Sequence, residues 1–203
     1  MTRGKQAQVR RDEILDAAGR LFVAKGYAAT TITDLLDEVG IARGTLYHHY
    51  KSKEQVLQGL IRRHGDRLLD QLATVLASDQ SALLKLGACL ASLAPQDLEQ
   101  AALVAELSSA GDAAMFMISL DDLVLRLAPA VAQVITQGVF EGVFDTSHPL
   151  TITRVLLVAI HGLLDNPGLT WTAEERTELL AGIVDAAERM LGALPGSLAT
   201  MAK

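Results

Sequence analysis

Residues 43–50 of the chain, RGTLYHHY, place a hydroxyl group and two imidazoles on one short predicted helix. At roughly 100° of rotation per residue, Leu46 and Tyr50 fall on one side of this helix, so we expect them to pack inward. Thr45 and His48 then point the opposite way. Hydroxyls and imidazoles can hydrogen-bond to base edges, and such short, nearly uncharged side chains suit a helix that enters the major groove of DNA.

Four further residues border this outward face. Gly44 lies beside it, and Tyr47 and His49 flank it. Arg43 does not fall on the face by angle, but it stands at the helix start, where its long side chain can reach a guanine or a phosphate. The segment 43–49 is therefore the candidate DNA contact.

A metal-binding interpretation of the paired histidines is disfavoured by geometry. Adjacent side chains of a helix diverge by roughly 100°, so His48 and His49 cannot easily share one ion. The five histidines of the chain are scattered, and only His161 lies in an apolar predicted helix. The serines and acids show no spacing typical of a nucleophilic site. We expect no metal, no cofactor and no enzyme activity.

Lys53 provides an independent indication. It lies in the first turn of a predicted helix, where a cation opposes the helix dipole by about 0.3–1 kcal/mol. A DNA phosphate would reverse that sign, because the lysine and the helix N-terminus would both attract it. The alternative is that Glu54, the next residue, offsets the charge of Lys53.

The elements that must position these residues are all predicted to be helices, since Ala and Leu dominate and no segment alternates with period two. Gly26 ends the first helix, and Gly40 makes the sharp turn of a helix-turn-helix. About nine helices are expected, over approximate residues 9–25, 31–39, 43–50, 52–76, 81–94, 96–109, 119–142, 149–164 and 172–193.

Local signals support several of these boundaries. Thr31 with Asp34, and Thr172 with Glu175, have the spacing of a capping box at a helix start. Pro129 should bend the longest helix, because proline removes one hydrogen bond and crowds the preceding turn.

The composition predicts a globular protein with a basic N-terminal part. Residues 1–67 contain 12 Lys and Arg against 8 Asp and Glu, whereas residues 68–203 contain 6 against 16. A basic head on an acidic body favours a polyanion partner for the head only. The alternative is that the basic arm, residues 1–11, is a solvated tail.

The same sequence favours the cytoplasm. It lacks an apolar run near the roughly 18–20 residues that span a bilayer, and no apolar stretch follows the basic N-terminus as in a secretory signal. The single cysteine, Cys89, excludes an internal disulfide and fits a reducing compartment.

Residues 30–57, TTITDLLDEVGIARGTLYHHYKSKEQVL, resemble the DNA-binding domain of the TetR family of bacterial transcriptional regulators. The resemblance covers about residues 9–60, and its most specific part runs from Gly40 to Lys53. It implies an all-α fold, with an N-terminal helix-turn-helix domain at 1–52 and a C-terminal effector-binding and dimerisation domain at 53–203.

The resemblance also assigns roles to residues. Arg43 and Thr45 are expected at the bases, and Tyr47, Lys53 and Thr31 at phosphates. The full set of expected DNA contacts is Thr31, Arg43, Gly44, Thr45, Tyr47, His48, His49 and Lys53.

The sequence departs from the family pattern in two places. Leu36 and Val39 stand where alanine is common, which predicts a wider crossing of the second and third helices. Ala42 stands where serine or threonine often caps the recognition helix, a cap worth about 0.5–2 kcal/mol.

The C-terminal part suggests a dimer and a ligand. An apolar stripe on the last helix suits a four-helix interface between two subunits, although it could also cover only its own core. Its members are Leu180, Ile183, Ala187, Met190 and Leu194. Met115, Phe116, Met117 and His161 are candidates for a pocket that binds a small, largely apolar effector, although each could be ordinary core.

The expected function is a dimeric, ligand-responsive repressor of a pseudo-palindromic double-stranded operator. The alternative is a constitutive or architectural DNA-binding protein without a ligand.

Overall fold

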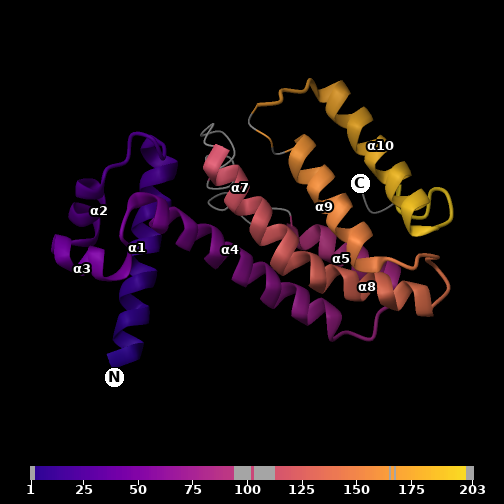
Figure 1. Cartoon of the computed structure of the whole chain (residues 1–203), viewed down its shortest axis with the longest axis horizontal. Coiled ribbons are helices and arrows are strands. Elements are labelled where there is room, and N and C mark those ends of the chain that lie inside the picture. The colour runs from indigo at the N-terminus through magenta and orange to yellow at the C-terminus, as the bar shows by residue number, and fades with distance from the viewer. Residues whose placement is uncertain (1–2, 94–101, 103–112, 165, 167, 200–203) are drawn as a thin grey trace. The chain divides into compact units, whose positions relative to one another are not determined.

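The computed structural model of the chain is built from helices (Figure 1). It describes residues 3–93, 102, 113–164, 166 and 168–199, and all regular elements within these ranges are helical. They are α1 (Arg3–Lys25), α2 (Ile32–Val39), α3 (Arg43–His49), α4 (Lys53–Leu76), α5 (Ala82–Leu93), α7 (Ala113–Asp122), the π-helix η1 (Leu123–Leu127), α8 (Ala128–Phe140), α9 (Pro149–Leu164) and α10 (Ala173–Leu191). The predicted helix at 96–109 lies outside the described residues, apart from residue 102.

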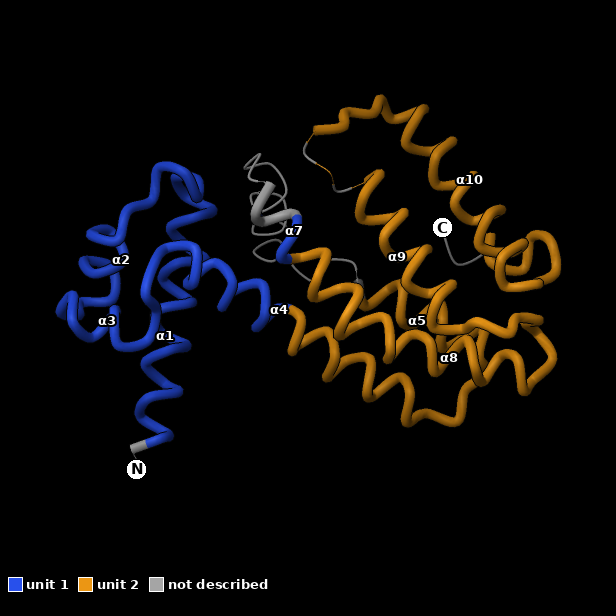
Figure 2. Tube along the Cα trace, viewed as in Figure 1, with its two compact units in different colours: residues 1–64, 96–118 blue, residues 65–95, 119–203 orange. Residues whose placement is uncertain are grey.

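The chain divides into two compact units (Figure 2). Unit 1 comprises residues 1–64 and 96–118, and unit 2 comprises residues 65–95 and 119–203. The division falls within α4, so this helix begins in unit 1 at Lys53 and continues along the chain into unit 2.

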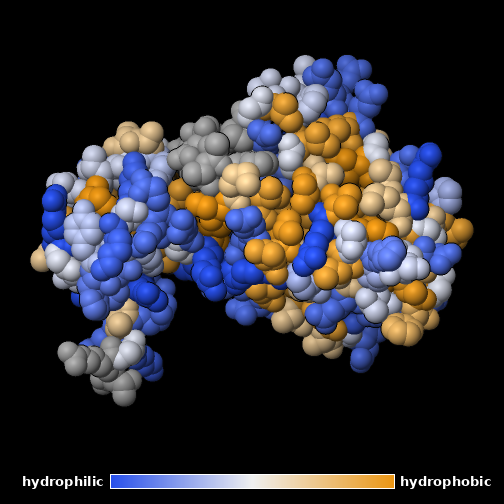
Figure 3. Space-filling model, in the orientation of Figure 1, coloured by the Kyte–Doolittle hydropathy of each residue, from blue (hydrophilic) through white to orange (hydrophobic). Residues whose placement is uncertain are grey.

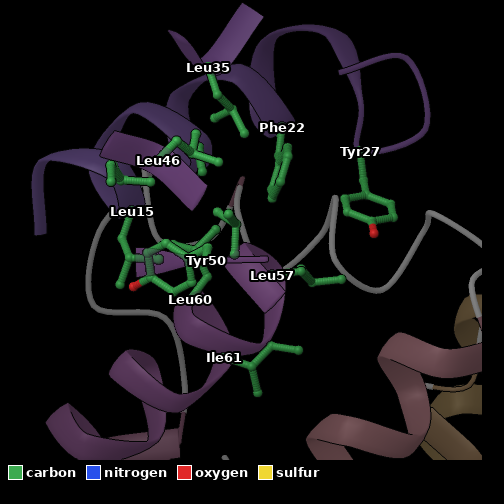
Figure 4. Packing of buried hydrophobic residues seen from close by; sticks show 12 residues of the cluster. Leu15, Phe22, Tyr27, Leu35, Leu46, Tyr50, Leu57, Leu60 and Ile61 are labelled. Atoms are coloured by element: carbon green, nitrogen blue, oxygen red, sulfur yellow. The ribbon is translucent and has the colours of Figure 1, made fainter. Parts of the chain in front are cut away.

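Unit 1 encloses a small core between α1, α2, α3 and α4. Helix α1 contributes Ile14, Ala18 and Phe22, which recur at four-residue steps and are each 0% exposed. Leu35 of α2 and Leu46 of α3 are also fully buried against them, and Figure 4 shows these side chains converging. This shared core sets the orientation of α3.

Local chemistry determines where α2 begins and ends. Thr31 and Asp34 form the predicted capping box, with the hydroxyl of Thr31 accepting from the Asp34 N–H and the Asp34 side chain accepting from the Thr31 N–H. Gly40 closes the helix in the left-handed conformation with φ of 68°, and its N–H donates to the Leu36 carbonyl. The predicted turn at Gly40 is thereby confirmed.

Helix α1 begins earlier than predicted. The sequence indicated a start near Val9, but the helix extends back to Arg3. The added residues include Lys, Gln, Ala and Arg, all good helix formers, and the single weak residue Gly4 does not stop the helix. Residues 4–9 of this extension are exposed.

Unit 2 is built around α8. This helix contacts both α5 and α9, and α9 contacts α10. Phe144 follows the end of α8 and packs back on Gly138, where an added Cβ would lie 2.1 Å from the Phe144 ring. That contact folds the segment after α8 back onto the helix.

The predicted continuous helix at 119–142 is wrong in its start and in its regularity. Helical structure begins at Ala113, and the π-helix η1 interrupts it before α8. Pro129 lies in the first turn of α8, and the Ala128 N–H reaches back five residues to the Leu123 carbonyl. A wide turn just before Pro129 accommodates a residue that cannot donate its own hydrogen bond.

One stretch of the described chain, Met117–Phe140, is long and apolar enough on average to cross a membrane, with a mean hydropathy of 1.5. It contains Asp121, Asp122 and Arg126, and it buries Val134 and Ile135 in the core of unit 2. These contacts are those of a core helix.

Candidate DNA-binding interface

Helix α3 presents the face that its periodicity predicts. Leu46 is 0% exposed and Tyr50 is 8% exposed, so both anchor the helix in the core of unit 1. On the opposite side, Arg43, Gly44, Thr45 and His48 are all exposed. The helix therefore offers a short polar face that is exposed among the described residues of unit 1.

Gly44 is open on this face. A Cβ added at this position would meet nothing within 4 Å. Glycine in a helix costs about 1 kcal/mol relative to alanine, so packing within the chain does not explain this residue. The helix backbone is accessible at this position.

The two histidines lie in different surroundings. Their rings meet edge to face at a centroid distance of 5.2 Å, with His48 exposed and His49 half-buried. Burial lowers the pKa of His49, and the charges of His48, Arg11 and Arg10 lower it further. These effects favour the neutral form of His49, which can both accept and donate a hydrogen bond.

Arg10 and Arg11 of α1 lie near enough to His49, at the end of α3, for their charges to lower its pKa. The sequence indicated that the arm carries positive charge, but not that this charge lies beside the histidines.

The hydroxyl and N–H groups of Thr31 are both bonded within the N-terminal cap of α2. Its hydroxyl donates to Asp34 Oδ2 at 2.7 Å, and its N–H donates to the same oxygen at 2.7 Å. Lys25 Nζ also lies 2.5 Å from Asp34 Oδ2. The bond from Lys25, followed by those from Thr31, holds the pKa of Asp34 well below its usual range.

Helix α3 lacks a side-chain cap, because Ala42 at its N-cap has no side-chain oxygen. The backbone instead closes the first turn, with the Thr45 N–H donating to the Ala42 carbonyl at 2.9 Å. The remaining N–H groups at this end are available to an anion such as a phosphate.

Lys53 Nζ points into unit 1. It donates to the carbonyls of Tyr27, Ala28 and Thr30 at 2.8, 3.3 and 2.9 Å. It also lies 4.3 Å from the centre of the Tyr27 ring. The predicted need of this cation for a negative partner is thus met by backbone carbonyls of the α1–α2 loop.

Sequence reasoning did not single out Lys51. It lies in the exposed turn between α3 and α4, and its Nζ donates to the Tyr47 carbonyl at 2.6 Å. A cation at the C-terminus of a helix complements the helix dipole. The position of Lys51 directly after Tyr50 is the sequence feature that could have predicted this role.

The candidate effector residues fall in both units. The side chains of Met115 and Phe116, on α7, lie outside the described residues. Met117 belongs to unit 1 and is 52% exposed. His161 belongs to unit 2, where its Nε2 lies 3.0 Å from Ser119 Oγ. Among the described residues, no three His, Cys, Asp or Glu side chains gather as a metal site.

The predicted dimer stripe is partly used within unit 2. Ala187 packs against the core, whereas Ile183 and Met190 are half-buried. Leu180 is 38% exposed, and Leu194, beyond the end of α10, is 78% exposed.

Comparison with known proteins identifies the helix-turn-helix. Residues 14–60 match the family described as bacterial regulatory proteins, tetR family. A 81-residue segment is 42% identical to the HTH-type transcriptional repressor KstR2 of Mycolicibacterium smegmatis, covering 40% of this chain and 40% of the relative. Residues 14–60 therefore resemble the DNA-binding segment of tetR family regulators, and the chain matches about 40% of the length of this relative.

Solved structures extend the likeness in fold to nearly the whole chain. GusR of Salmonella enterica shares 19% identity at a TM-score of 0.67, covering 95% of this chain and 99% of that protein. RolR in complex with resorcinol shares 17% identity at a TM-score of 0.68, covering 99% and 96%. The described part of the chain thus shares the all-helical fold of these two proteins.

Proposed function

We propose that the protein is a dimeric transcriptional repressor that binds a pseudo-palindromic operator and is released by a small, largely apolar effector. The observation that carries the proposal is the exposed polar face of α3, anchored from behind by Leu46 and Tyr50. The similarity to KstR2, a named repressor, supports this role. It is a role in the bacterial cytoplasm, where the DNA lies, and not that of an enzyme.

In this function α3 enters the major groove. Thr45 and Arg43 hydrogen-bond to base edges, and His48 and His49 border the groove. Tyr47 contacts the phosphate backbone, as do the N–H groups at the uncapped start of α3. Phosphate contacts set the register, whereas the contacts of Thr45 and Arg43 determine the preferred sequence.

The second copy of the chain binds through α9 and α10. These helices contact each other and both leave aliphatic side chains exposed, including Val155 at 47% and Leu180 at 38%. Figure 3 shows apolar side chains gathered over unit 2. An added Cβ at Gly162 or Gly182 would meet nothing within 4 Å, which leaves room for a close helix crossing.

The charges on α10 favour an antiparallel pairing. Glu174 and Glu175 lie in its first turn and Arg189 in its last turn. A two-fold axis near Gly182 would set Arg189 of one copy near the acidic end of α10 in the other copy. Each contact would then occur twice, once on each side of the axis. Two-fold protein symmetry in turn requires a two-fold symmetric operator.

The effector site is proposed among the helices of the C-terminal body. The hydrogen-bonded pair of Ser119 and His161 supplies polar atoms next to apolar α9. The fold relative RolR binds resorcinol, a small aromatic molecule, which supports a ligand of similar size. Binding would act through α4, which belongs to both units, by favouring one position of its N-terminal end.

The test begins with selection of duplexes from a random pool by the purified full-length chain. Recovery of inverted repeats, with binding of two chains per duplex by light scattering, supports the proposal. Recovery of a single unsymmetrical half-site bound by one chain would overturn the dimeric mode.

A second measurement distinguishes the ligand-responsive repressor from the alternative, a constitutive DNA-binding protein. Candidate effectors are titrated into the protein with and without the selected operator. A true effector must bind more weakly in the presence of operator by the same factor with which it weakens the operator complex. Equal effector affinity in both titrations rules out the switch but not DNA binding.

A further inference from the structure

We infer that Arg154 on α9 pairs with Glu178 on α10 of a second copy of the chain, and that this pair favours a second copy over other partners. The inference rests on the proposed dimer and deepens it, because it names the charges that set the register of the two subunits. It concerns only residues of unit 2.

Arg154 is a cation without a bonded partner in the described part of its own chain. Its Nε is buried and has no hydrogen-bond partner there, and none of the ion pairs within the described residues includes it. A guanidinium carries five N–H donors, and a buried donor that is left unbonded destabilises a protein. We therefore expect an acceptor from outside the chain.

The side of α9 that carries Arg154 is accessible. Thr151, three residues before it, and Val158, four residues after it, share its side of the helix, and both are exposed. Val155, the next residue, is 47% exposed. An added Cβ at Gly162, four residues beyond Val158, would meet nothing within 4 Å. Arg154 is thus the single charge in an open row of uncharged residues.

Helix α10 carries the matching negative charge. Glu178 is exposed, and no residue of the described chain binds it. Glu175 is bonded in the helix cap, and Asp185 pairs with Arg189. Glu174, the other exposed acid of this helix that is not bonded, lies one turn nearer the helix start. Glu178 is therefore the acid nearest the middle of α10 that is available to a partner.

Helices α9 and α10 run antiparallel within one chain (Figure 1). At one end of the pair, the Asp145 N–H, shortly before α9, donates to the Leu191 carbonyl at the end of α10 at 2.7 Å. At the other end, Trp171 Nε1, shortly before α10, donates to the Leu163 carbonyl at the end of α9 at 2.7 Å. The starts of the two helices therefore lie at opposite ends of the pair, and each of the two charges lies near the start of its own helix.

A two-fold axis brings the two charges together. Arg154 is five residues beyond Pro149, and Glu178 is five residues beyond Ala173. Each therefore lies about 7.5 Å along its helix from the first residue. An axis perpendicular to the helix pair, as proposed near Gly182, places the start of the partner's α10 beside the start of α9. Arg154 then faces the partner's Glu178, and the pair occurs twice.

The pair explains why the partner is a second copy. A guanidinium and a carboxylate form two parallel hydrogen bonds, and solvent ions screen such a pair less when it is buried in an interface. One surface of the chain supplies both halves of this pair. A partner without an acid at this place would leave the guanidinium of Arg154 unpaired in an apolar interface, which is costly. The charges thus disfavour other partners.

The decisive experiment reverses these charges in the full chain. Arg154→Glu and Glu178→Arg each set like charges against each other twice in a homodimer, so each should weaken self-association by about tenfold or more. A mixture of the two variants restores opposite charges at both places and should form heterodimers about as tightly as the wild type self-associates. Sedimentation velocity, with one variant carrying a fluorophore, measures both. Arg67→Glu, at an exposed position of α4 in unit 2, makes the same change in net charge and should associate as the wild type does.

Recovery in the mixture separates a pair between chains from a structural role within one chain. If each variant alone associates as the wild type does, or if the mixture stays as weak as the separate variants, the pair is wrong. Melting temperatures show whether Arg154→Glu folds. If it does not, Glu178→Arg is compared with the double variant Arg154→Gln with Glu178→Arg. The double variant should associate more tightly, because the repulsion is removed, and equal association would overturn the pair.

The wild-type protein distinguishes failure of this inference from failure of the proposed function. A wild type that stays monomeric would overturn the proposed dimer, and the pair with it. A wild type that forms dimers, together with charge-reversed variants that form them equally well, would overturn the pair alone.

Discussion

The hydroxyl of Thr31 and the carboxylate of Asp34 bind each other at the start of α2. Asp34 Oδ2 accepts from both the hydroxyl and the N–H of Thr31, and the Asp34 N–H donates to the Thr31 hydroxyl oxygen at 3.2 Å. The arrangement satisfies two backbone donors at once. It also means that the Thr31 hydroxyl proton has a partner before any DNA arrives.

The first prediction is that Asp34→Asn makes the protein less stable and changes its dependence on pH. The pKa of Asp34 is lowered in the folded state, first by Lys25 and then by Thr31, so the unfolded chain binds the proton more tightly. The stability from this group is present above the ordinary pKa of an aspartate and is lost as the pH falls below it. Denaturant unfolding at pH 7 and at pH 3 should show a wild-type advantage that shrinks at the lower pH. An advantage that stays constant would contradict the assigned cause.

The second prediction concerns sequence preference. Thr45→Ala removes an exposed hydroxyl from the outward face of α3 and should relax the preference at one base pair, by about 1–3 kcal/mol if a good contact is lost. The measurement is a competition between the selected operator and single-base variants. Thr74→Ala, at an exposed position of α4 in unit 2, is the matched control and should bind as the wild type does. Unchanged preference in Thr45→Ala would show that the face is wrongly assigned.

The third prediction concerns the basic extension of α1. Deleting residues 1–8 should weaken DNA binding, chiefly at lower salt, because cations are removed that can act on phosphates or in the minor groove. The melting temperature should hardly change, since residues 4–9 are exposed and the core begins near Ile14. Equal affinity of the shortened and full chains across a salt series would make the extension a solvated tail.

The fourth prediction concerns the interface between two copies. Leu180→Glu should convert the proposed dimer to a monomer, because the variant places two charges in the proposed apolar interface. The folded monomer should survive, since Leu180 is 38% exposed in the single chain. Sedimentation velocity measures the change. Leu84→Glu, at a 63% exposed position of α5, is the control and should remain dimeric.

Short-range features were largely predictable from the sequence. The capping boxes at Thr31 with Asp34 and at Thr172 with Glu175 are both present, and α9 spans the predicted range Pro149–Leu164. The facing of α3 also follows, because helix geometry alone decides which residues share a side. Irregularity within a helix was not predictable in the same way: Pro129 indicated a bend, but the π-helix η1 also depends on the packing of the long helix.

The sequence by itself determined that a helix-turn-helix is present, which side of α3 is polar, and that Lys53 requires a negative partner. Only the tertiary structure determined which atoms of the chain serve as that partner. The carbonyls of Tyr27 and Thr30 lie 26 and 23 residues before Lys53, and they reach it because the loop after α1 returns over the start of α4. Contacts across three or four residues follow from helix geometry, whereas a contact across more than twenty depends on how the whole domain packs.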